Sequence, residues 1–136
     1  MKRAVELMCV PPSMAGEVWP KVGHFLVAAA RRGGLHLPEV VARLPTGDAL
    51  LWVAVEGDAF AAAAITQLER GDDGTSCRLV AAGGIGAAGW VHLIDGIEAY
   101  ARAEGCVRMR FEGRHGWRRH LPDYQVPRAV FEKDIR

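Results

Sequence analysis

The spacing of apolar residues alternates along this chain between the two-residue period of strands and the 3.6-residue period of helices. Apolar or alternating runs bounded by turn residues predict strands over residues 5–10, 50–55, 60–68, 77–82, 107–111 and 126–135. Helical spacing predicts a helix after Ser13, which can cap it, with Pro20 interrupting the run and Gly33-Gly34 ending it. It also predicts a short helix over residues 38–44 and a longer one over residues 90–103. These elements predict an α/β (α+β) domain.

Two turn signals join the middle strands into an antiparallel meander. Glu56-Gly57-Asp58 is a tight turn after the second strand, and Gly71-Asp72-Asp73-Gly74 is a strong turn after the third. The third strand is rich in alanine, which has a weak strand propensity, so its prediction depends on its place in the hairpin.

The longer helix and the strand after it each present one apolar face. One face of the helix carries Trp90, Leu93, Ile94, Ile97, Tyr100 and Ala101, whereas His92, Asp95 and Arg102 lie on the other. Val107, Met109 and Phe111 then alternate with charged residues, as in a half-buried strand. A charged turn and short helix are expected over residues 112–124, before the last strand.

The length and charge indicate one domain over residues 1–136 with no global attraction to nucleic acid or membranes. Half of the 136 residues are apolar, and the net charge is +1. Cys9, Cys77 and Cys106 match no zinc pattern, and we expect buried thiols in a reducing compartment. No membrane segment or signal-peptide core is apparent, so we expect a soluble, cytoplasmic protein.

Two local phrases resemble those of a known fold. The helix phrase over residues 97–106, with Glu98 and Ala101 before Gly105-Cys106, is similar to E-x-x-A-x-x-x-G-C of the GNAT (Gcn5-related N-acetyltransferase) family. The ending over residues 121–124 and 130–135 is similar to the family's l-G-F and m-x-K-x-L. The resemblance covers essentially the whole chain. It implies a mixed, mostly antiparallel sheet flanked by helices, in which the fourth and fifth strands splay to admit the pantetheine arm of acetyl-CoA.

A closer resemblance is to small phage and prophage proteins with a GNAT-like fold. These share a Gly-Arg-x-Gly-Trp-x-Arg-x-Leu-Pro-x-Tyr phrase, which stands here at residues 113–124. The opening over residues 6–12 and the phrase at residues 17–20 are also similar to that group. The resemblance implies a host-cell cytoplasmic protein that is also a candidate for a place in the virion or its assembly.

In GNAT enzymes the pyrophosphate of acetyl-CoA binds backbone N–H groups where the central helix begins, in the phrase Arg/Gln-x-x-Gly-x-Gly/Ala. Counting back from Gly105 places Ala88 and Trp90 at the two glycine positions and Ile85 at the Arg/Gln position. No register restores the full phrase. The segment is nevertheless rich in glycine, which lets a backbone approach an anion closely, and its candidate cofactor-binding residues are Gly83, Gly84, Gly86 and Gly89.

The family's general-acid Tyr is replaced here. Aligning the ending with the family pattern puts Arg119 at that position, and arginine does not release a proton at neutral pH. His115 and His120 are nearby and titrate in the right range, so they are the candidate catalytic residues. Glu56, Glu69 and Glu112 are candidate bases at strand ends.

Arginines gather in the last third of the chain. A patch formed by Arg108, Arg110, Arg114, Arg118 and Arg119 suits phosphates or nucleic acid, whereas a solvated face balanced by nearby carboxylates is the plainer interpretation. His92 and Asp95 are spaced as a metal pair, but no further ligands are evident, so no metal is expected.

These observations leave two main hypotheses. The first is a phage-type GNAT-like protein without catalytic activity, which binds a protein partner or a second copy of itself and uses no cofactor. The alternative is an acyl-CoA-dependent N-acyltransferase with a degenerate phosphate loop, which would use acetyl-CoA.

Overall fold

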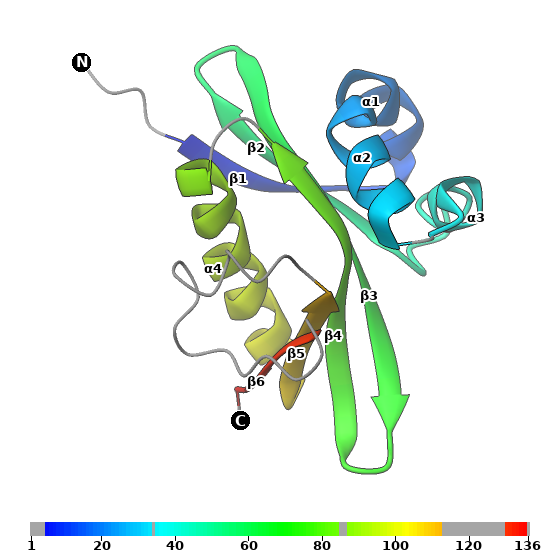
Figure 1. Ribbon diagram of the computed structural model, residues 1–136, viewed down its shortest axis with the longest axis vertical. Coiled ribbons are helices and arrows are strands. Elements are labelled where there is room, and N and C mark those ends of the chain that lie inside the picture. The colour runs from blue at the N-terminus through cyan, green and yellow to red at the C-terminus, as the bar shows by residue number, and fades with distance from the viewer. Residues whose placement is uncertain (1–4, 34, 85–86, 113–129, 136) are drawn as a thin grey trace.

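The fold centres on one six-stranded sheet. We describe it from a computed structural model, in which residues 5–33, 35–84, 87–112 and 130–135 are described. The strands lie in the order β1-β2-β3-β4-β5-β6 (Figure 1). Neighbouring strands are antiparallel, except for β4 and β5, which are parallel. The predicted mixed, mostly antiparallel sheet is confirmed.

The elements follow the predicted order within the described residues. The strands are β1 (Val5–Val10), β2 (Leu50–Glu56), β3 (Ala59–Gly71), β4 (Gly74–Gly84), β5 (Arg108–Glu112) and β6 (Val130–Asp134). The helices are η1 (Pro12–Met14), α1 (Ala15–Val22), α2 (His24–Gly33), α3 (Leu37–Val41) and α4 (Ala87–Ala103).

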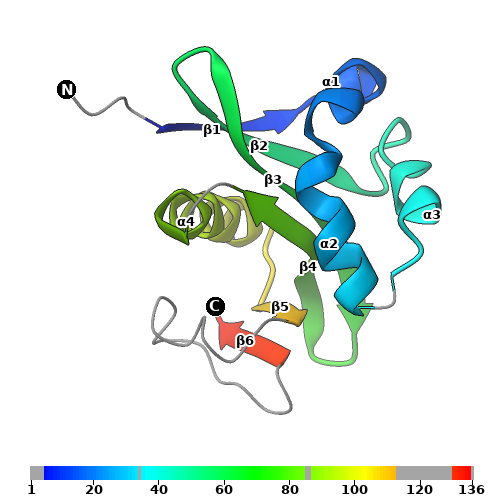
Figure 2. The same cartoon turned by 45° about the horizontal axis from the view of Figure 1, so that its top comes forward.

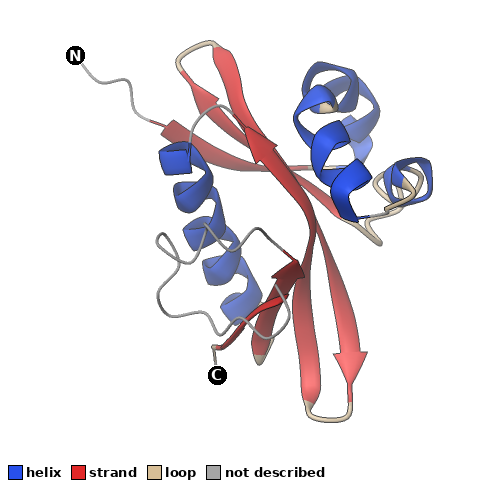
Figure 3. Cartoon of the chain, viewed as in Figure 1, coloured by secondary structure: helices blue, strands red, loops and turns tan. Residues whose placement is uncertain are grey.

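Helices cover both faces of the sheet. Helix α4 lies on one face, and α1, α2 and α3 lie on the other (Figures 1 and 3). Turning the molecule shows the same two layers with the sheet between them (Figure 2). One hydrophobic cluster fills each side: Leu93, Ile94 and Ile97 of α4 pack on the first, and Val22 and Leu26 pack on the second. The faces predicted for α4 are confirmed where its side chains are described.

Strand β3 forms in spite of its alanines because it lies in the middle of the sheet. Ala62, Ala63 and Ala64 are fully buried between β2 and β4. Small side chains let helices approach both faces closely, and the burial and the paired backbone outweigh a weak intrinsic propensity. The only buried indole among the described residues, that of Trp52, donates from Nε1 to Oγ1 of the neighbouring Thr66 at 2.9 Å.

The predicted glycine end of α4 is confirmed. Gly105 has φ +78°, a conformation that side chains with a Cβ adopt at a cost. The N–H of Cys106 donates to the carbonyl of Ala101 at 2.9 Å, and that of Gly105 donates to the carbonyl of Arg102 at 3.1 Å. These two bonds satisfy carbonyls at the helix end and turn the chain back into β5.

The first helical region differs from its prediction. Ser13 makes no capping hydrogen bond and lies inside η1. The predicted single helix is divided at Gly23 into α1 and α2, whereas Pro20 lies inside α1. A Cβ on Gly23 would lie 3.1 Å from the ring of Trp19. The packed indole therefore leaves little room for a side chain at the break between α1 and α2.

Other boundaries also shift. Helix α3 is shorter than the predicted 38–44 and gives way to turns, although Leu44 is still buried. Strands β3 and β4 extend further than predicted. Their hairpin runs on past the last β2 pair, Leu50 with Thr66, and projects from the sheet (Figure 1). The short helix predicted within residues 112–124 lies almost wholly outside the described residues, as does the 126–129 part of the predicted last strand.

Candidate functional site

Strands β4 and β5 pair over only three residues. The pairs are Ser76–Arg108, Cys77–Met109 and Arg78–Arg110. Beyond them β4 continues to Gly84 with no partner from the described part of β5 (Figure 1). The predicted splay between these strands is therefore confirmed, and among the described residues the edge of β4 that faces β5 has no strand partner beyond Arg78.

A β-bulge marks the same stretch of β4. The register with β3 shifts between the pairs Ile65–Ala81 and Thr66–Leu79, so that Val80 has no partner. A bulge turns the backbone locally away from the ladder, and bulges are common next to active sites. Within the described part of the chain, the open edge and the bulge together leave backbone groups of β4 without a strand partner beside the gap in the pairing.

The candidate glycines of the phosphate loop do not all lie in the same element. Gly83 and Gly84 lie at the end of β4, Gly89 lies in the first turn of α4, and Gly86 lies outside the described residues. A Cβ on Gly83 would lie 2.0 Å from the carbonyl oxygen of Phe25 in α2. A Cβ on Gly84 would lie 2.5 Å from the Cβ of Ala62. Close packing within the protein therefore explains both of these glycines without a ligand.

The start of α4 is suited to an anion. Helix N-termini present free N–H groups and a partial positive charge, and the first turn of α4 contains no acidic residue. Trp90 is also in this turn, and its side chain is not among the described ones. A diphosphate bound here would have the open edge of β4 beside it. The helix start, rather than Gly83 and Gly84, is therefore the candidate anion site among the described residues.

The candidate catalytic histidines, His115 and His120, lie outside the described residues, and their roles stay predictions. Of the candidate bases, Glu56 is exposed at the end of β2, and Glu69 forms an ion pair with Arg78 at 3.3 Å.

The structure describes two members of the predicted arginine patch. Arg108 forms ion pairs with Asp73 at 2.9 Å and Asp134 at 3.1 Å. The hydrogen bond with Asp73 is the main reason that the pKa of Arg108 is raised. Arg110 is exposed on the same strand. Arg114, Arg118 and Arg119 lie outside the described residues, so the nucleic-acid interface stays a prediction.

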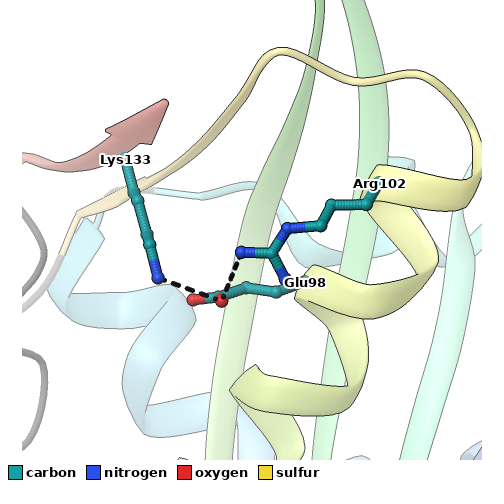
Figure 4. Close-up of polar contacts among 3 residues, drawn as sticks. All are labelled: Glu98, Arg102 and Lys133. Atoms are coloured by element: carbon teal, nitrogen blue, oxygen red, sulfur yellow. Dashed lines mark hydrogen bonds and ion pairs between the residues drawn. The ribbon is translucent and has the colours of Figure 1, made fainter. Parts of the chain in front are cut away.

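Sequence reasoning missed a buried charge cluster on α4. Glu98 is only 6% exposed, and its carboxylate lies 3.3 Å from Nζ of Lys133 in β6 and 3.7 Å from the guanidinium of Arg102 (Figure 4). The cluster ties the last strand to the helix. The sequence did contain a signal for this cluster, because Glu98 and Lys133 belong to the two phrases that carry the family resemblance.

The cysteines differ in their surroundings. Cys77 and Cys106 are buried as expected, but Cys9 is exposed on the edge strand β1, so its expected burial is wrong. Burial, followed by the neighbouring Cys106, raises the pKa of Cys77 to about 12. The three sulfurs are free thiols. Within the described residues, no cluster of three or more His, Cys, Asp or Glu side chains could hold a metal ion.

Comparison with solved structures identifies the fold. An agmatine N-acetyltransferase aligns over 97% of this chain and 100% of its own, with a TM-score of 0.73 and 8% identity. A predicted acetyltransferase from Clostridium acetobutylicum, solved with acetyl-CoA, aligns over 92% of each chain, with a TM-score of 0.67 and 9% identity. A putative GNAT-family acetyltransferase from Desulfovibrio desulfuricans aligns over 96% of this chain and 99% of its own, with a TM-score of 0.62 and 14% identity.

This chain has the GNAT fold. The likeness is one of structure, because no family model matches the chain and no curated protein matches it in sequence. The neighbours do not support the phage or prophage origin or the virion location that the sequence suggested. No helix in the described ranges is long and apolar enough to cross a membrane.

Proposed function

We propose that this protein is an acyl-CoA-dependent N-acyltransferase. The observation that carries the proposal is the open edge of β4 beyond Arg78, which lies next to the N-terminus of α4. The structural neighbours that share this fold are described as acetyltransferases, one of them in complex with acetyl-CoA. These findings favour the catalytic hypothesis over the non-catalytic one.

Each part of the proposed site has its own role in this reaction. Bound acyl-CoA supplies an activated thioester, from which the acyl carbon passes to an amine nitrogen as the C–S bond breaks. The backbone N–H groups of the first turn of α4, at Gly89 and its neighbours, would hold the pyrophosphate. The free edge of β4 would align the pantetheine amides and set the thioester beside the amine, which by itself supplies much of the rate. His115 or His120 would carry the proton from the amine toward the leaving thiolate.

One observation favours the alternative, a non-catalytic protein that keeps the fold and binds a partner. Gly83 and Gly84 are required by close contacts with Phe25 and Ala62. Their presence therefore does not indicate a phosphate site. If acetyl-CoA does not bind, the fold is retained for a partner, and the phage-type interpretation returns as the leading hypothesis.

Calorimetric titration with acetyl-CoA tests the proposal. We expect saturable binding, followed by release of free thiol when amines are added. In the variant Gly89→Glu a carboxylate enters the first turn of α4, where it should repel the diphosphate and weaken binding at least tenfold. Ala99→Glu makes the same charge change at an exposed position further along the helix, and it should bind as the wild type does.

No heat at millimolar acetyl-CoA would reject the proposal. Equal affinities for wild type and Gly89→Glu would show that the cofactor does not bind at the start of α4. Binding without thiol release from any amine would support cofactor sensing rather than transfer.

A further inference from the structure

The pairing of β4 with β5 ends on two arginines. Arg78 and Arg110 are register partners and form the last described pair before the strands part. Both are exposed. Their neighbours Cys77 and Met109 are buried against α4, so strand alternation places both arginines on the opposite face, which carries α2.

This position is the narrow end of the opening. From Arg78 to Gly84, β4 covers six residue steps, or about 20 Å of extended chain. A cofactor with its phosphates at the start of α4 and its pantetheine along β4 would bring its thioester toward Arg78 and Arg110. The acceptor amine has to arrive at the same end.

Two like charges directly opposite one another are unfavourable in a sheet. Here Glu69 contacts Arg78 at 3.3 Å, and Glu132 is the register partner of Arg110 in β6. The row of register partners across the four strands is Gln67, Arg78, Arg110 and Glu132, and Glu69 contacts Arg78 diagonally from two residues further along β3. A carboxylate placed over the middle of the row could bond both guanidinium groups, which suit bidentate carboxylate recognition.

We infer that Arg78 and Arg110 bind a carboxylate of the acceptor, so that the substrate is an amino acid or another amine that carries an acid group. The inference rests on the proposed function, because it names the acceptor of the same site. An acceptor with an acid group would set this protein apart from its structural neighbour, the agmatine N-acetyltransferase.

Matched acceptors test the inference. 4-Aminobutanoate and its amide differ only in the carboxylate, which is three methylenes from the amine. With saturating acetyl-CoA, we expect a KM for the acid at least tenfold below that for the amide. Arg78→Gln and Arg110→Gln should each raise the KM for the acid about tenfold, with no change for the amide or for acetyl-CoA.

Arg70→Gln is the matched control. Arg70 is an exposed arginine of the same hairpin, paired with Thr75, and strand alternation places it on the α4 face. Its loss should leave the KM for the acid unchanged. Glu69→Gln removes the competing carboxylate from Arg78 and should lower that KM. Equal KM values for acid and amide, or equal effects of all three arginine substitutions, would overturn the inference.

A binding measurement keeps this test separate from that of the proposed function. If no acceptor turns over, calorimetry with succinate and with succinamide still reports on the arginine pair. Binding of succinate alone, weakened by Arg78→Gln and Arg110→Gln but not by Arg70→Gln, supports the carboxylate site even in a protein without transferase activity. Failure of succinate to bind, or binding that survives both substitutions, contradicts it.

Discussion

At the scale of single residues, Gly83 shows how a glycine can be required for packing where the sequence suggested ligand binding. A Cβ at this position would lie 2.0 Å from the carbonyl oxygen of Phe25, a backbone atom that moves only if α2 moves. We therefore expect Gly83→Ala to destabilise the fold by about 1–3 kcal/mol, the usual cost of overpacking. Urea unfolding followed by circular dichroism measures the change.

Gly16→Ala is the control for this substitution. Gly16 lies in α1, and a Cβ there would meet nothing within 4 Å. Alanine is the better helix former by about 1 kcal/mol, so this variant should be as stable as the wild type or more so. If Gly83→Ala unfolded at the same urea concentration as Gly16→Ala, α2 could not lie as close to β4 as described.

At the scale of elements, Arg108 holds three segments together. Its guanidinium contacts Asp73 in the turn of the β3–β4 hairpin and Asp134 in β6, from its own place in β5. Arg108→Gln should lower the free energy of unfolding by about 1 kcal/mol, because each partly exposed ion pair contributes up to about that much. The difference from wild type should shrink in 1 M salt, which screens the charges.

Chemical denaturation at low and high salt measures this contribution. Arg70→Gln, at an exposed position of the same hairpin, should change the stability little at either salt concentration. A loss in Arg108→Gln that is independent of salt would mean that the side chain acts through packing of its aliphatic part instead of its charge.

At the scale of the whole molecule, the Cys77 thiol and the Tyr100 phenol should make the stability of the fold sensitive to high pH. Burial raises the pKa of Cys77 from 9.0 to about 12. Burial, followed by Glu104 and the nearby thiols, raises the pKa of Tyr100 from 10.0 to about 12. The unfolded chain loses these protons at lower pH than the folded one. Stability should therefore be complete below pH 9 and fall as the pH rises toward 12.

Urea unfolding at a series of pH values tests this prediction. Cys77 is fully buried, and above pH 9 it should contribute a slope of about 1.4 kcal/mol per pH unit. Cys77→Ala should remove that part of the slope, and Tyr100→Phe should remove a smaller part, because Tyr100 is half-buried. A free energy of unfolding that stayed constant from pH 9 to 11 would contradict the prediction.

Most of the secondary structure could be predicted from the sequence because it depends on local patterns. The alternation at Met109 and Phe111, the helical stripe of Leu93, Ile94 and Ile97, and the glycine end at Gly105 each have a short-range signal. Ser13 was misread as a cap because its neighbour Pro12 begins a short 3-10 helix instead. Of the candidate site, the sequence predicted the splay through family resemblance and the glycines through composition.

The sequence by itself determined the order of the elements and the faces that they bury, because burial of apolar side chains follows periodicity along the chain. Only the tertiary structure decided what individual polar and glycine positions do. Gly83 packs against α2, and Glu98 accepts a hydrogen bond from Lys133, 35 residues away. Arg78 is the register partner of Arg110 in the last pair before β4 and β5 part. Such contacts join distant segments, and a spacing rule along one segment carries no information about which other segment will lie beside it.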